Sequence, residues 1–147
     1  MTVGLDMYLN AKRFLWHSED ELAGKVGELF PELGDSRVKE VTAEIMYWRK
    51  SNAIHKWFVD NVQEGVDECQ ESWLDREKLE ALLAVINEVL TNRKKAMELL
   101  PPQQGFFFGS KDVDEWYWDD LTRTKAGLED ILSKEWKGWD FYYRASW

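Results

Sequence analysis

The stretch VTAEIMYWRKSNAIHKWFVDNVQ, residues 41–63, changes its hydrophobic period part-way along. Its first half alternates, which predicts a half-buried strand with Val41, Ala43, Ile45 and Tyr47 on one side and Glu44, Met46 and Trp48 on the other. From Ser51 or Asn52, whose short side chains can cap a helix, apolar residues recur with helical spacing. The apolar arc comprises Ala53, Ile54, Trp57, Phe58 and Val62, the polar face comprises Asn52, Lys56, Asp60 and Gln63, and His55 lies at their boundary. A strand leading directly into a helix is therefore predicted.

The same two patterns recur along the rest of the chain. Alternation predicts strands at 3–11 and 139–147 and a weaker strand at 68–74. A short helix is predicted to begin after Ser18 and to end at Pro31.

Two long helices are also predicted. Asp75 would cap the first, which ends at Pro101, and Asp112 with Glu115 resembles a capping box for the second, which runs to about Lys134. Strands near both ends with helices between them predict an α+β fold in a single domain, residues 1–147. We expect one antiparallel or mixed sheet of about four strands, covered on one face by the two long helices.

The aromatic content is high for a chain of 147 residues. It has nine Trp, seven Phe and five Tyr, which is more than a core of this size needs. Some of these rings should be partly exposed, and exposed Trp and Tyr favour contact surfaces because they offer apolar area at a small entropic cost.

Charge and cysteine content exclude several classes of protein. A net charge of -9 argues against direct binding to nucleic-acid backbones, which requires clustered bases. The single cysteine, Cys69, excludes an internal disulfide and fits a reducing cytoplasm. The chain begins without a signal-peptide pattern and has no apolar run long enough to span a membrane, so we expect a cytoplasmic protein.

Three segments carry a resemblance to known sequences: GLDMYL at 4–9, YWRKSNAIHKWF at 47–58 and GFFFGS at 105–110. Together with the aromatic C-terminal strand, they resemble a family of small uncharacterised bacteriophage proteins. The resemblance implies an accessory product in the cytoplasm of a host bacterium. It carries no activity and no catalytic residues, so the function must be inferred from the residues themselves.

The strand-to-helix junction is a candidate anion site. Arg49, Asn52, His55 and Lys56 gather there with Lys50, close to a helix N-terminus whose free N–H groups already favour negative charge. The alternative is that the bases are solvated turn residues and His55 is a packed histidine.

Aromatic side chains supply candidates for stacking on a planar ligand. Phe107, in the Gly-bounded loop 103–110, could stack on a base, or the loop could be a short buried edge strand. The other candidates for stacking are Trp48, Trp116 and Trp118. The acids from Asp112 to Asp120 have ligand chemistry for Mg²⁺ or Ca²⁺ but lack a binding-loop spacing, so no metal and no cofactor is predicted.

One face of the predicted sheet mixes rings and charges. Away from the helices would lie Asp6, Tyr8, Asn10, Glu44, Trp48, Tyr142 and Arg144. Such a face is too apolar for bare solvent, so we expect a second subunit, a ligand or the segment 12–36 to cover it.

Three functional hypotheses follow. The first is a non-catalytic, homo-oligomeric counter-defence protein that sequesters a small anionic ligand, such as a nucleotide-derived signal, with Arg144 as a further contact. The second is an acidic inhibitor that covers a basic host protein. The third is an unrecognised enzyme, for which Cys69 with His17 or His55, and the pair Asp6 and Glu44, are the only candidates and no catalytic motif is present.

Overall fold

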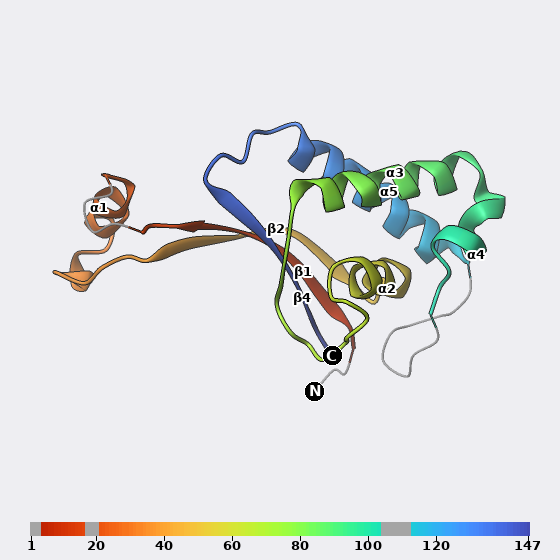
Figure 1. Cartoon of the computed structure of the whole chain (residues 1–147), viewed down its shortest axis with the longest axis horizontal. Helices are drawn as coiled ribbons and strands as arrows, with labels where there is room; N and C mark the ends of the chain where they lie inside the picture. The colour runs from red at the N-terminus through yellow and green to blue at the C-terminus, as the bar shows by residue number, and fades with distance from the viewer. Residues whose placement is uncertain (1–3, 17–20, 104–112) are drawn as a thin grey trace.

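The computed structural model describes residues 4–16, 21–103 and 113–147. It contains a four-stranded, fully antiparallel sheet in the order β2-β1-β4-β3. The strands are β1 (Asp6–Phe14), β2 (Glu40–Arg49), β3 (Ser72–Leu74) and β4 (Trp139–Ser146). The first strand begins and ends later than predicted, and the third is shorter. The predicted α+β fold is confirmed (Figure 1).

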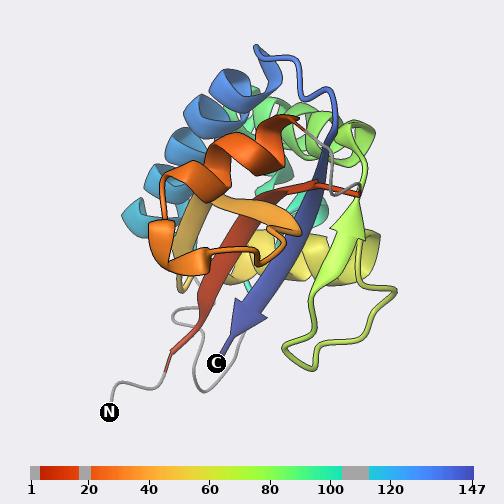
Figure 2. The ribbon, with the colours of Figure 1, turned by 90° about the vertical axis from the view of Figure 1, so that its left-hand side faces the viewer.

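The three longest helices lie over one face of this sheet (Figure 1). The α-helices are α1 (Glu21–Glu28), α2 (Asn52–Asn61), α3 (Arg76–Thr91), α4 (Ala96–Leu99) and α5 (Glu115–Leu132), and the 3₁₀ helices are η1 (Pro31–Leu33) and η2 (Arg93–Lys95). Figure 2 shows α3 and α5 side by side, as predicted for the two long helices. Their apolar stripes and that of α2 enclose the inward residues of β1, Met7, Leu9 and Ala11, which are fully buried.

The ends of the two long helices follow their capping residues. Asp75 caps α3 as predicted, because its carboxylate accepts from the Lys78 N–H at 3.0 Å. The helix then stops at Asn92 instead of continuing to Pro101, because Asn92 takes an extended backbone and its side chain caps η2. Asp114, rather than Asp112, caps α5, and Asp112 lies outside the described residues.

A β-bulge interrupts the alternation of β2. Asn10 of β1 pairs with Glu44, but the preceding Leu9 pairs with Met46, which leaves Ile45 as an extra residue. Met46 consequently points inward, where its side chain lies against Gly127 of α5; a Cβ at Gly127 would be 2.7 Å from the methionine methyl group. Every residue of β2 after the bulge therefore points to the opposite face from the one that an unbroken alternation predicts.

Trp48 is the main consequence of this reversal. It pairs with Met7, is fully buried, and donates from Nε1 to Thr124 Oγ1 at 2.8 Å. Tyr47 instead lies on the outer face beside Tyr8. The prediction that Trp48 lies on the outer face is wrong, because an unbroken period of two was assumed.

Two polar residues of the predicted helix, Asn52 at the start of α2 and Gln63 just after its end, are also more buried than helical spacing predicts. Asn52 is buried because its carbonyl oxygen accepts from the Gln103 N–H, and Gln63 is buried because its amide donates to the Gln70 carbonyl. Both side chains satisfy backbone groups of neighbouring segments, so their burial costs little.

Beyond Arg13, β1 pairs with β2 and no longer with β4, and the two segments continue as a short two-stranded arm that carries α1 at its far end (Figure 1). Trp16 and Leu29, each 73% exposed, and Phe30 lie at this end and are here called the arm tip. Four of the nine tryptophans, namely Trp16, Trp73, Trp116 and Trp147, are exposed, as the aromatic surplus predicts. No helix among the described residues is long and apolar enough to cross a membrane.

Candidate functional site

A cavity of about 650 Å³ lies between the start of α2 and the first turns of α5. Its lining comes from the β2–α2 junction (Arg49, Lys50, Ser51, Asn52, Ala53, Ile54), from Pro102, and from α5 with its cap (Asp114, Trp116, Tyr117, Asp119, Asp120, Leu121, Arg123). The volume lies within the range of sites that hold small molecules.

The β2–α2 junction presents the start of α2 to this cavity. Lys50 adopts a left-handed backbone with φ of 56°, and its N–H donates to the Leu5 carbonyl at 2.7 Å. This conformation is uncommon for a residue other than glycine and turns the chain sharply from strand into helix. Ser51 makes no side-chain capping bond, so its hydroxyl does not occupy the first N–H groups of α2. The positive end of the α2 dipole therefore faces the cavity.

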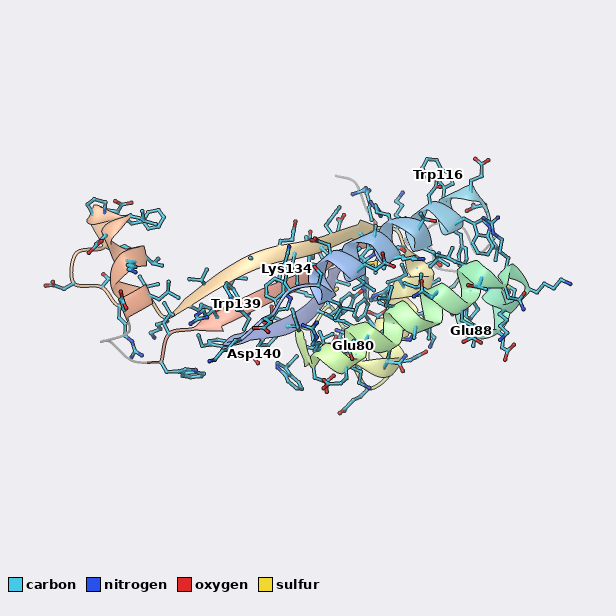
Figure 3. All side chains as sticks on the ribbon, turned by 90° about the horizontal axis from the view of Figure 1, so that it is seen from above. Glu80, Glu88, Trp116, Lys134, Trp139 and Asp140 are labelled. Atoms are coloured by element: carbon cyan, nitrogen blue, oxygen red, sulfur yellow. The ribbon has the colours of Figure 1, made fainter. Side chains whose placement is uncertain are left out.

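The start of α5 forms the opposite wall. Asp114 accepts from the Tyr117 N–H at 3.0 Å and so fixes where the helix begins. The Tyr117 hydroxyl donates to the Leu100 carbonyl at 2.7 Å, and burial raises the pKa of Tyr117 to about 12, which keeps this donor protonated. Trp116 is 78% exposed and projects from the first turn of α5 (Figure 3). The cavity thus has a hydrogen-bonded wall with an exposed indole at its rim.

Opposite charges line the two walls. Arg49 and Lys50 lie at the junction, and Arg49 also pairs with Asp6 at 3.2 Å. On α5, Arg123 pairs with Asp120 at 3.2 Å. The pair is partly exposed, so it can exchange partners at little cost.

The environment of Asp120 sets its protonation. Burial raises the pKa of Asp120, whereas a hydrogen bond from Ser51 and the Arg123 charge lower it. The neighbouring carboxylates of Asp119 and Asp114 raise it further. The pKa of Asp120 therefore depends on Ser51 from one side of the cavity and on Arg123, Asp119 and Asp114 from the other.

The structure brings three of the predicted site residues, Arg49, Asn52 and Trp116, into this cavity. Phe107 and the rest of the Phe-rich loop lie outside the described residues, as does His17. Lys56 pairs with Asp60 at 2.9 Å and lines a smaller, separate cavity.

The remaining predicted residues point elsewhere. Trp48 is in the core, and Trp118 lies beneath the Arg93 guanidinium at 4.4 Å. Arg144 is exposed on the outer face of the sheet, opposite Tyr8. The eight predicted residues that the structure describes therefore lie in at least four different environments, which the helical and strand periods alone do not distinguish.

His55 belongs to a buried network behind α2. Its Nδ1 lies 2.6 Å from the Tyr143 hydroxyl, and its Nε2 lies 3.0 Å from Asp67 Oδ1. Burial lowers the pKa of His55 against the opposing effect of Asp67, and burial also raises the pKa of Tyr143. A neutral histidine that accepts from Tyr143 and donates to Asp67 satisfies both distances. The Trp147 indole donates to the same carboxylate at 3.2 Å, so the network ties the C-terminal strand to the loop after α2.

Sequence reasoning predicted Trp116 but missed the other residues that α5 contributes to the site. The spacing of Trp116, Asp119 and Arg123 places them along one side of a helix, which was the available signal. Their acids were interpreted only as helix-start residues and as an unconvincing metal site. Among the described residues, no group of three or more His, Cys, Asp or Glu side chains could hold a metal ion.

Comparison with known proteins adds no relative: no family model, no curated protein and no solved structure matches the chain.

Proposed function

We propose that this protein is a non-catalytic binder that sequesters a small, planar, anionic ligand of the nucleotide type. The single observation that carries the proposal is the cavity on which the N-termini of α2 and α5 converge, with Arg49, Lys50 and an exposed indole at its edge. Helix N-termini favour anions because their N–H groups are not used within the helix.

The lining supports a ligand that spans the cavity. Its anionic group would lie at the α2 start, where the dipole contributes about 0.3–1 kcal/mol. Its planar group would stack on Trp116, for which stacking contributes about 1–3 kcal/mol. The bacteriophage resemblance supports a counter-defence role in the host cytoplasm, because removal of an immune signal requires tight binding and no chemistry.

A thermal-shift screen with cyclic and linear nucleotides tests this proposal. At a ligand concentration of about 100 Kd, binding stabilises the protein by about 2.7 kcal/mol, which corresponds to roughly 5–11 °C for a domain of this size. We expect Arg49→Ala and Trp116→Ala to abolish the shift. Arg144→Ala is the matched control, because this exposed arginine lies away from the cavity, and it should keep the shift. No shift with any nucleotide would refute the proposal.

A second candidate function, contact with another protein chain, is favoured by the arm. The arm extends past β4 by the Phe14–Glu40 pair and the Leu15–Lys39 hydrogen bond, and it carries the exposed arm tip. The outer face of the sheet also exposes Tyr47 and Trp73. A second copy of the chain or a basic host protein would bury these groups, and the net charge of -9 favours the basic partner.

Sedimentation velocity distinguishes these two partners. Self-association through the arm predicts a concentration-dependent dimer that Leu29→Ser weakens and Trp116→Ala leaves unchanged. A monomer at every concentration would remove self-association and leave only the basic host protein as partner of the arm.

A further inference from the structure

We infer that the cavity selects guanine among the nucleobases, and that Asp119 is the residue that makes this selection. The inference rests on the proposed function and adds to it the identity of the base. It follows from the bonding of each acid in the lining and from the placement of Asp119 relative to Trp116.

The three carboxylates of the lining differ in what they already bind. Asp114 accepts from the Tyr117 N–H as the cap of α5. Asp120 accepts a hydrogen bond from the Ser51 hydroxyl and pairs with Arg123. Asp119 is exposed and makes no hydrogen bond or ion pair within the described part of the chain. Asp119 therefore offers the cavity two acceptor oxygens that no donor among the described residues uses.

Asp119 and Trp116 are three residues apart on α5 and both line the cavity. Residues at this spacing have Cβ atoms about 5–6 Å apart on one side of a helix. A base that stacks on the Trp116 ring would therefore place one edge within reach of the Asp119 carboxylate. The phosphate end of the same ligand would point across the cavity, toward Arg49 and the start of α2.

The chemistry of the base edges decides which base fits. A carboxylate only accepts hydrogen bonds, and its two oxygens are best satisfied by two adjacent donors. Guanine presents such a pair in N1–H and its 2-amino group. Adenine and cytosine each place an acceptor nitrogen beside their amino group, and uracil places its N3–H between two carbonyl oxygens. Only guanine satisfies both oxygens without directing a lone pair at the carboxylate.

Isothermal titration calorimetry with GMP, IMP and AMP tests the inference directly. IMP differs from GMP only by the missing 2-amino group, so it reports the second hydrogen bond alone. We expect the wild-type protein to bind GMP about 10- to 100-fold more tightly than IMP or AMP, because a hydrogen bond to a charged group is lost. Asp119→Asn should lower the affinity for GMP to near that for IMP and should leave IMP little affected.

Glu115→Gln is the matched control, because it removes one carboxylate from the first turn of α5 at a residue that does not line the cavity. It should keep the preference for GMP. Equal binding of all three nucleotides by the wild type, or a preference that survives in Asp119→Asn, would overturn the guanine assignment while leaving the proposed function intact. No binding of any nucleotide would overturn the proposed function and the inference together.

Discussion

The hydrogen bond between Trp48 and Thr124 gives a sharp test of the bulge in β2. Both side chains are fully buried, and the indole N–H has the Thr124 hydroxyl as its partner at 2.8 Å. Thr124 in turn donates to the Asp120 carbonyl at 2.6 Å. The perturbations are Thr124→Val, Trp48→Phe and the double substitution.

The expected losses of unfolding free energy follow from these contacts. Thr124→Val keeps the shape of the side chain but leaves the indole N–H buried without a partner, which costs about 1–3 kcal/mol. Trp48→Phe loses the same hydrogen bond, about 0.5–1.5 kcal/mol, together with part of the ring volume in the core, for a total of about 2 kcal/mol. In the double variant no donor is stranded, so its loss should be smaller than the sum by about 1 kcal/mol.

Urea unfolding followed by circular dichroism measures all four proteins of this cycle. Trp16→Phe is the control, because Trp16 is 73% exposed and its replacement should change the unfolding free energy by less than about 0.5 kcal/mol. If Trp48 lay on the outer face, Trp48→Phe would behave like this control and its effect would add to that of Thr124→Val. That result would refute the bulge and the facing of the strand after it.

Three further predictions concern stability. Burial lowers the pKa of His55 below its value in the unfolded chain, so the unfolded chain binds this proton more readily. The free energy of unfolding should therefore fall as the pH drops below about 6.5. Urea unfolding at pH 7.5 and 5.5 measures this fall, and His55→Gln should lack it. Asp75→Ala should lower the unfolding free energy by about 0.5–2 kcal/mol in denaturant titrations, since α3 loses its cap; an unchanged midpoint would contradict this. Gly138→Ala should lower the free energy of unfolding by about 1 kcal/mol, because φ is 85° and an added Cβ would lie 2.9 Å from Arg13 Nη1. Gly24→Ala in α1 is the control and should not destabilise, because its added Cβ meets nothing within 4 Å. Equal thermal midpoints for the two variants would contradict this geometry.

The sequence alone predicted only part of the candidate site. Arg49 and Asn52 stand out because a strand leads directly into a helix, and that junction is local. The opposite wall comes from α5, far along the chain, and Asp119 and Arg123 acquire a role only when α5 lies over β2. His55 has the composition of a ligand residue, yet Tyr143 and Asp67 occupy both of its nitrogens.

Local pattern was sufficient for the element types, the α+β class and the Asp75 cap, because side-chain period and capping depend on the backbone geometry of a few neighbouring residues. Tertiary structure alone decided the facing of Trp48, the end of α3 at Asn92 and the cavity between α2 and α5. The reason is that a single extra residue in a strand reverses every side chain after it, and its position depends on pairing with β1 and packing under α5 rather than on the letters of β2 itself.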